Sequence, residues 1–211
     1  MSAEPSGTCT DASFIARHDG HRLFPHLVRL LARGRPLPLE ELAGAAKEPL
    51  ARIRSFLEAQ PATEWDDHGR LVGFGLTQRP TPHRLVVGDQ DLCTWCATDT
   101  LLFTVILGRD TTVHSRCPAT GQAVHVELSP QGLRRVDPHE AVVSQITPAG
   151  EADDFRSVVC DHGHFFASAE HARPWLGEHP GGLLLGVAAA FEAARATCVT
   201  LGWVAPSVTE L

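Results

Sequence analysis

In the first third of the chain, apolar residues recur at the spacing of an amphipathic helix. Three such stretches, the first ended by Gly34-Arg35-Pro36, predict three short helices. Their expected bounds are residues 22–32, 39–46 and 48–59. Two further stretches, 63–65 and 71–76, flank Asp66-Asp67-His68-Gly69, which predicts a β-hairpin with turn residues at its tip. Three helices followed by a hairpin are typical of a winged helix.

The most apolar helical stretch follows in the middle of the chain. It begins polar at Trp95, becomes apolar as far as residue 107, and stops at Gly108, which is typical of a glycine C-cap. A buried helix is therefore predicted over about residues 91–107. Cys96 and Asp99 would share one face of it, and in the first turn the helix dipole favours a thiolate. The alternative is simply a buried cysteine on a core helix.

The remainder of the chain combines strand-like and helical patterns. Strands are predicted at residues 83–87, 111–116, 124–128, 132–136 and 141–146. Helices are predicted at 169–176, with Ser168 as the N-cap, and at 183–203, whereas 151–158 is ambiguous. The fold class is therefore α+β. A linker at Pro80 to Pro82 divides it into a winged-helix-like N-terminal domain, 1–80, and a second domain, 81–211.

Charge and hydropathy restrict the partners that this chain is expected to have. The 211 residues are 43% hydrophobic and carry a net charge of −7, and residues 1–80 hold equal numbers of basic and acidic residues. Lys47, Arg52 and Arg54 lie on or beside the third helix, but a neutral domain favours a packing role over DNA binding. The first twenty residues lack an apolar signal segment, and Glu192 and Arg195 interrupt the most apolar stretch, so no membrane partner is expected.

The cysteine content indicates a reducing cytoplasm and thiol or metal chemistry rather than a disulfide framework. The six cysteines stand at positions 9, 93, 96, 117, 160 and 198. Cys93, Cys96 and Cys160 with a nearby histidine would make a zinc site, and Cys93 with Cys96 would make a redox pair. His162 and His164 would share one face if they lay in a strand, but ordinary polar residues of a strand or loop are the favoured interpretation.

A third interpretation unites Cys96, Asp99 and Cys160 in one site. Thiolates are soft ligands and select soft metals. Two thiolates would push electron density onto a soft metal that is bonded to carbon, and would thereby weaken the metal–carbon bond. The carboxylic acid, or a proton that it relays from a thiol, would then protonate the departing carbon.

The order and spacing of several motifs resemble the organomercurial lyases (alkylmercury lyases) of bacterial mercury resistance. The similar motifs are Gly34-Arg35-Pro36, Gly73-Phe74-Gly75-Leu76-Thr77, Trp95-Cys96-Ala97 with Asp99, Cys117-x-Ala119-Thr120-Gly121, and Cys160 before His164-Phe165-Phe166-Ala167-Ser168. The resemblance implies a winged-helix-like, three-helix N-terminal part packed on a core of antiparallel β-strands and helices. It also implies protonolysis of the carbon–mercury bond, which gives a hydrocarbon and Hg(II).

Carried over to this sequence, the resemblance makes Cys96 and Cys160 the mercury-binding thiolates. Asp99 becomes the proton carrier and a further contact to the metal, and Cys117 takes a structural role. No organic cofactor is implied. Hg(II) remains bound as the product until external thiols remove it, and a mercuric reductase is the implied acceptor. The substrate is an organomercurial small molecule, and no nucleic acid is expected as a partner.

Two positions depart from the family pattern. Asp161 stands where the best-known members have a second cysteine, and activity is expected to survive because that thiol is outside the family's catalytic set. Cys93 is an additional thiol, which would reach Cys96 if both lay on one helix and would then trap Hg(II) or support zinc binding. The alternative function is a winged-helix metal-binding regulator, or a thiol scavenger of mercury or zinc.

Overall fold

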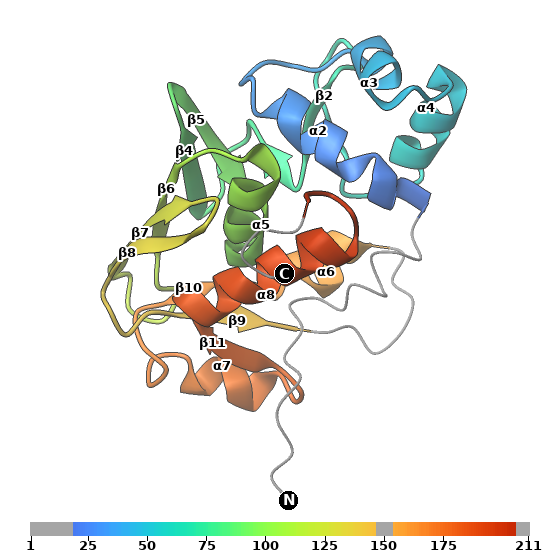
Figure 1. Ribbon diagram of the computed structural model, residues 1–211. Helices are drawn as coiled ribbons and strands as arrows, with labels where there is room; N and C mark the ends of the chain where they lie inside the picture. Colours follow the sequence, from blue (N-terminus) through green and yellow to red (C-terminus); the bar gives the residue numbers. More distant parts are fainter. Residues whose placement is uncertain (1–18, 147–153, 206–211) are drawn as a thin grey trace, which may run out of the picture.

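The computed structural model describes residues 19–146 and 154–205, and its α+β architecture confirms the predicted fold class (Figure 1). Two antiparallel sheets and a group of N-terminal helices surround a central helix. Cys9 lies outside the described residues, as do residues 151–153 of the ambiguous stretch. No helix in the described ranges combines the length and apolar character that crossing a membrane requires.

The N-terminal part has the three helices and the hairpin that the sequence predicts. A short 3₁₀ helix, Asp19–Arg22, precedes α2 (Phe24–Leu31), α3 (Leu39–Ala46), α4 (Leu50–Glu58), β1 (Glu64–Trp65) and β2 (Leu71–Phe74). Pro38 and Pro49 fix extended backbone directly before α3 and α4, which sets where each helix begins. The second arm of the hairpin is shorter than predicted, because Gly75 (φ +73°) ends β2 and β3 (Leu76–Thr77) is a separate strand.

The larger sheet joins this hairpin to the rest of the chain. Its strand order is β1-β2-β3-β5-β4-β6-β7-β8, and all neighbours are antiparallel. The later strands are β4 (His83–Val87), β5 (Gln90–Thr94), β6 (Thr111–Arg116), β7 (Ala123–Ser129) and β8 (Gly132–Asp137). Because β3 pairs with β5, the sheet continues past residue 80, and a domain boundary at that residue stays a prediction.

The predicted start of the central helix was wrong. Residues 90–94 form β5, and helix α5 (Ala97–Leu107) begins only after it. A tight turn at Gly88 (φ +58°) pairs Val87 with Gln90, and alternation along β5 then buries Leu92. Cys93 is half-buried on this strand, so the condition that Cys93 and Cys96 lie on one helix is not met.

A smaller antiparallel sheet, ordered β10-β9-β11, holds the C-terminal third of the chain. It consists of β9 (Val142–Gln145), β10 (Phe165–Phe166) and β11 (Leu183–Gly186). The last helix therefore starts later than predicted, since residues 183–186 pair with β9 and α8 spans Val187–Thr200. The helix predicted at 169–176 is also displaced: Ser168 accepts a hydrogen bond from the His171 N–H in a turn, and α7 spans Arg173–Glu178.

Two short helical segments connect β9 to β10. Helix α6 (Phe155–Val158) has Asp154 as its N-cap, and the Asp154 side chain accepts hydrogen bonds from the backbone N–H groups of Arg156 and Ser157. A 3₁₀ turn, Cys160–His162, follows directly. His162 therefore lies in this turn and His164 in the loop before β10, which agrees with the favoured interpretation of both as ordinary polar residues and not with a shared strand face.

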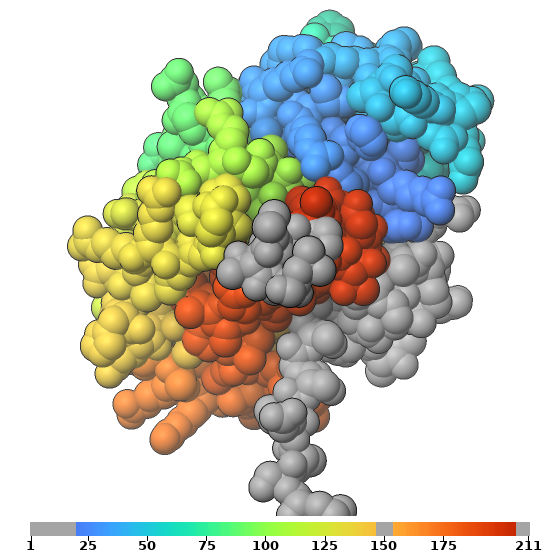
Figure 2. Space-filling view, viewed as in Figure 1, coloured from blue at the N-terminus to red at the C-terminus, as the bar shows by residue number. Residues whose placement is uncertain are grey.

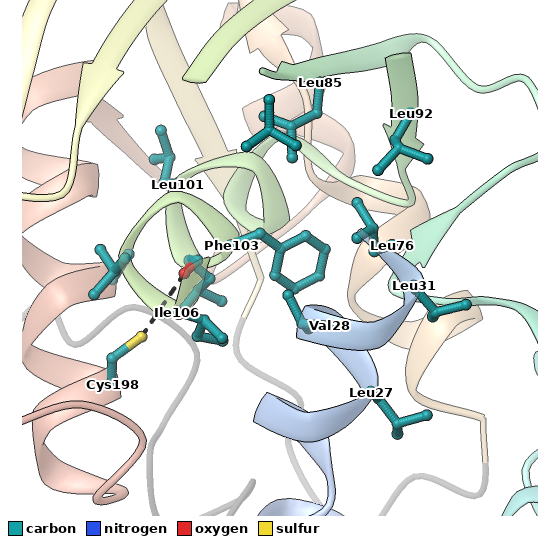
Figure 3. Packing of buried hydrophobic residues seen from close by; sticks show 14 of the residues in the cluster. Leu27, Val28, Leu31, Leu76, Leu85, Leu92, Leu101, Phe103, Ile106 and Cys198 are labelled. Atoms are coloured by element: carbon teal, nitrogen blue, oxygen red, sulfur yellow. Dashed lines mark hydrogen bonds between the residues drawn. The ribbon is translucent and has the colours of Figure 1, made fainter. Parts of the chain in front are cut away.

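Helix α5 forms the centre of the hydrophobic core. Every residue from Ala97 to Ile106 is buried, because the larger sheet, α2 and α8 cover different sides of the helix. Figure 3 shows Phe103 pointing from α5 toward Val28 of α2, and the Cys198 thiol of α8 facing the Leu102 carbonyl at 4.0 Å. The central helix is thus fixed by several neighbouring elements at once.

The segment that follows α8, which includes Trp203, packs against the N-terminal helices, and Figure 2 shows it beside the first of them. The Trp203 Nε1 donates to the His21 carbonyl at 2.8 Å, and Arg29 donates to the Trp203 carbonyl at 3.3 Å. The Trp203 ring centre also lies 5.0 Å from that of Phe24. These contacts join the N-terminal part to the core, as predicted.

Candidate active site

Cys96 is the N-cap residue of α5. Its extended backbone (φ −140°, ψ 170°) places the thiol over the first turn, where Sγ accepts a hydrogen bond from the Asp99 N–H at 3.3 Å. In return, the Asp99 carboxylate accepts from the Cys96 N–H at 3.2 Å. This reciprocal pair is a capping box in which a thiol takes the place of the usual hydroxyl. The hydrogen bonds that start the helix therefore also hold the thiol beside the carboxyl group.

Cys160 reaches the same point from the 3₁₀ turn. The Gly163 N–H donates to the Cys160 carbonyl, and the Gly163 carbonyl accepts from the Ala97 N–H, both at 2.9 Å, so the turn is fastened to the start of α5. The Cys96 and Cys160 sulfurs and a carboxylate oxygen of Asp99 all lie within 4.8 Å of one another. Within residues 19–146 and 154–205, this is the one group of three potential metal-ligating side chains that comes so close.

Both thiols are buried and protonated at rest. Cys96 is 3% exposed and Cys160 is 2% exposed. Burial, a hydrogen bond with Cys160 and the charge of Asp99 raise the pKa of Cys96 well above its ordinary value. The hydrogen bond with Cys96 acts to lower the pKa of Cys160, but burial and nearby carboxylates outweigh it and raise that pKa too. The expectation that the helix dipole favours a Cys96 thiolate was therefore wrong, because desolvation dominates.

Asp99 is the one member of the cluster that is charged at neutral pH. Burial raises its pKa to about 6, although the hydrogen bonds from Cys96 and the charge of Arg156 act in the opposite direction. A mainly deprotonated carboxylate thus lies beside two neutral thiols. Such a carboxylate can accept a proton from a thiol whose sulfur bonds to a metal, and it can later release that proton.

An apolar cavity of about 110 Å³ lies beside the three groups, which line it. Its aromatic lining residues are Phe24, Phe56, Phe74, Trp95, Phe155 and Trp203. The first three belong to the N-terminal part, which therefore supplies a wall of the site. An engineered apolar cavity of about 150 Å³ binds benzene, so a cavity of this size and lining suits a small alkyl or aryl group.

An ion pair that no sequence pattern indicates lies beside the thiols. The Arg156 guanidinium lies 4.8 Å from the centre of the Trp95 ring and donates to Glu64 at 2.8 Å. Glu64 belongs to the N-terminal hairpin and is only 7% exposed. In the structure Gly73 stands opposite Glu64 in the hairpin and leaves room for the carboxylate to turn inward, a register that the sequence alone does not reveal.

The other candidate residues lie outside this cluster. Cys93 and Cys117 are free thiols, and Cys117 is buried just after β6, where Thr120 and the Ala167 backbone hydrogen-bond it. His162 Nδ1 lies 3.1 Å from His179 Nε2. Neither histidine nor Cys93 belongs to the close group of ligating atoms in the described residues, so the zinc site proposed from Cys93, Cys96, Cys160 and a histidine is not assembled.

Two buried thiols and a carboxyl group beside an apolar cavity define a class of protein, one that binds a soft metal carrying an organic group. Comparison with known families agrees with this class. A model described as alkylmercury lyase matches residues 76–198, and one described as the helix-turn-helix domain of alkylmercury lyase matches residues 18–75. The chain belongs to the alkylmercury lyase family.

Individual relatives match over most of their length. The alkylmercury lyase of Streptomyces lividans is 44% identical over 173 residues, which cover 82% of this chain and 80% of the relative. That of Pseudomonas putida is 42% identical over 169 residues, covering 80% and 79%. A crystal structure of the mercury-bound form of MerB2 has the same fold, with a TM-score of 0.74 and 23% identity, over 90% of this chain and 97% of that chain.

Proposed function

We propose that this protein cleaves the carbon–mercury bond of alkyl- and arylmercury compounds by protonolysis, giving a hydrocarbon and Hg(II). The observation that carries the proposal is the group formed by Cys96, Cys160 and Asp99, whose ligating atoms lie within 4.8 Å of one another beside an apolar cavity. The cavity receives the organic group, the thiols hold mercury, and Asp99 carries the proton.

The charge states of the site give the order of proton transfers. The substrate enters as R–Hg–X, where X is a small thiolate. Asp99 accepts the proton of Cys96 as its sulfur bonds to mercury and X departs, because a soft metal replaces the proton that burial otherwise retains. The Cys160 sulfur bonds to mercury next, and its proton combines with the departed thiolate X to give a free thiol. Asp99 then protonates the carbon, the carbon–mercury bond breaks, and RH leaves Hg(II) on the two sulfurs.

The product determines which partners the reaction needs. Hg(II) held by two thiolates is released only by competing thiols, so external thiols are required for turnover and a mercuric reductase is the proposed acceptor. The reaction uses no organic cofactor, since the proton and both ligands come from the chain. Five free cysteines among the described residues agree with a reducing environment, and we place the protein in the cytoplasm.

The test is product analysis with phenylmercury and excess thiol. We expect benzene, detected by gas chromatography, from the protein as it is and from the matched control Cys93→Ser, which removes a thiol outside the cluster. Cys96→Ser and Cys160→Ser should each abolish benzene formation while the fold is retained. Full activity in either variant would refute the assigned roles. Phenylmercury that binds but yields no benzene would instead identify a thiol scavenger.

A DNA-binding regulator is the less favoured alternative. Arg52 and Arg54 on α4 form ion pairs with Glu48 and Glu58 at 3.2 and 3.5 Å, so their charges are partly neutralised by nearby carboxylates. The N-terminal part instead directs Phe24, Phe56 and Phe74 into the cavity. Salt-dependent binding to duplex DNA, measured by fluorescence anisotropy, would favour the regulator.

A further inference from the structure

Glu64 of the N-terminal hairpin contacts both chain segments that carry the thiols. Its Oε1 accepts a hydrogen bond from Trp95 Nε1 at 3.1 Å and from Arg156 Nη1 at 2.8 Å. Trp95 directly precedes Cys96, and Arg156 lies in the short helix that leads into Cys160. One carboxylate oxygen therefore joins the two segments that must meet for both sulfurs to bind a single atom.

The surroundings of Glu64 fix the position of this oxygen. The other oxygen, Oε2, accepts a hydrogen bond from the Thr77 hydroxyl. Gly73 faces the same oxygen, and a Cβ atom there would lie 2.3 Å from Oε2 and 2.7 Å from the Thr77 hydroxyl. The carboxylate thus occupies space that only a glycine leaves open. A buried carboxylate needs such partners because charged groups are costly to remove from water.

The second acidic partner of Arg156 does not hold it in the same way. Asp161 lies 3.5 Å from the guanidinium, but its side chain is 54% exposed, whereas that of Glu64 is 7% exposed. Exposed ion pairs contribute little to fixing a geometry, while buried charge-assisted hydrogen bonds are strong and directional. Glu64 is therefore the partner that holds Arg156 against the Trp95 ring.

We propose that Glu64 is a positioning residue that sets the separation of the Cys96 and Cys160 thiols, through Trp95 on one side and Arg156 on the other. This gives the helix-turn-helix part a role in the reaction in addition to lining the cavity. The proposal rests on the proposed lyase function for its effect on turnover, but its effect on the thiols can be measured without any carbon–mercury chemistry.

The first experiment uses phenylarsine oxide, which condenses with two neighbouring thiols to give a cyclic dithioarsenite and one water. A pair held at a fixed separation binds this probe more tightly than two thiols that move independently. Loss of positioning by about 1 Å can cost about 100-fold. We expect Glu64→Ala to weaken phenylarsine oxide binding by about 10- to 100-fold and Glu64→Gln, which keeps an acceptor for Trp95, by a smaller factor.

The matched control is Glu41→Gln. Glu41 is also an acidic residue of the N-terminal part, and it pairs with Arg35 at 2.8 Å on the surface, away from the thiols. Its substitution should leave phenylarsine oxide affinity unchanged. Equal affinity in folded Glu64→Ala and in the unchanged protein would overturn the proposal. If Glu64→Ala does not fold, the proposal would be overturned by Glu64→Gln and Arg156→Gln variants that both bind phenylarsine oxide as tightly as the protein without substitutions.

The second experiment measures phenylmercury turnover in the same variants. We expect kcat to fall by about 10-fold or more in Glu64→Ala with little change in KM, because the first thiol still captures mercury but the second is misplaced. If the protein without any substitution forms no benzene, the lyase function is refuted, and the phenylarsine oxide affinities alone decide the role of Glu64. Benzene formed equally by Glu64→Ala and by the unchanged protein would refute the role of Glu64 alone.

Discussion

Gly163 lies where the turn that carries Cys160 meets the start of α5, and adding a methyl group there tests how closely the site is packed. Its backbone (φ −92°, ψ 100°) is accessible to any residue, so Gly163→Ala introduces no dihedral strain. The new Cβ would instead lie 2.8 Å from the Cys96 Cβ and 3.4 Å from its Sγ. The substitution therefore acts almost entirely on the position of the Cys96 side chain.

The size of the effect follows from that distance. Carbon atoms in contact prefer a separation of about 3.5 Å or more, so Cys96 or the turn must move by roughly 0.7 Å. The Gly163 carbonyl is hydrogen-bonded to the Ala97 N–H at 2.9 Å, which restricts movement of the turn. Overpacking of this kind costs about 1–3 kcal/mol of unfolding free energy. A shift of this size at a reacting sulfur should slow protonolysis by about 10- to 100-fold.

The assay is single-turnover benzene release from phenylmercury, together with urea denaturation. Gly44→Ala is the matched control, because nothing lies within 4 Å of its Cβ position on α3, and alanine there should stabilise the helix by about 0.5–1 kcal/mol. The inference that this contact holds the Cys96 thiol in place would be refuted by one outcome. In that outcome Gly163→Ala releases benzene at the rate of the protein without substitutions and has the same unfolding free energy.

Two further predictions concern groups whose pKa is shifted. Burial raises the pKa of Asp99 to about 6, so the folded state favours the protonated side chain more than the unfolded state does. This contribution to the unfolding free energy is fully present below about pH 4 and is lost as the pH rises through 6. Asp99→Asn should abolish turnover. It should also raise the unfolding free energy, measured in urea, by up to about 3 kcal/mol at pH 8, where the charged carboxylate is buried. A larger increase in unfolding free energy at pH 4 than at pH 8 would contradict this reasoning. Burial alone would raise the pKa of Cys117, but hydrogen bonds from Thr120 and Ala167 lower it. Cys117→Ala leaves those donors unpaired and should cost about 1–3 kcal/mol, with benzene formation retained.

The sequence predicted the helices and most strands because their patterns are local. The N-terminal helices and β6 are found where apolar periodicity places them, since proline or turn residues bound each one. Errors arose where a strand and a helix follow each other without a break, at residues 90–97 and 183–187. At residues 183–187 an apolar run hides the change of period, and at residues 90–97 no proline or glycine separates the strand from the helix. In each case only strand pairing reveals the strand, with β9 in the first and β4 in the second.

The composition of the site was easier to predict than its electrostatics. Cys96, Asp99 and Cys160 were identified from motif order, and the structure brings them together. Their protonation was not predictable in the same way, because desolvation depends on elements distant in sequence, such as α2 and α4, which line the cavity beside the thiols. Glu64 was missed for a related reason: no local pattern distinguishes a buried acidic residue in a hairpin from a solvated one.

Burial of the thiols explains how the site is selective without a charged nucleophile. A free thiolate at rest would react with oxidants and with many metal ions. Here the raised pKa values keep Cys96 and Cys160 protonated, and in the mechanism that we propose Asp99 removes the first proton only when a metal bonds to sulfur. The helix cap keeps that base in contact with Cys96 at all times. In the proposed mechanism, the same hydrogen bonds that begin α5 therefore couple mercury capture to proton storage, and the stored proton is the one that the carbon receives.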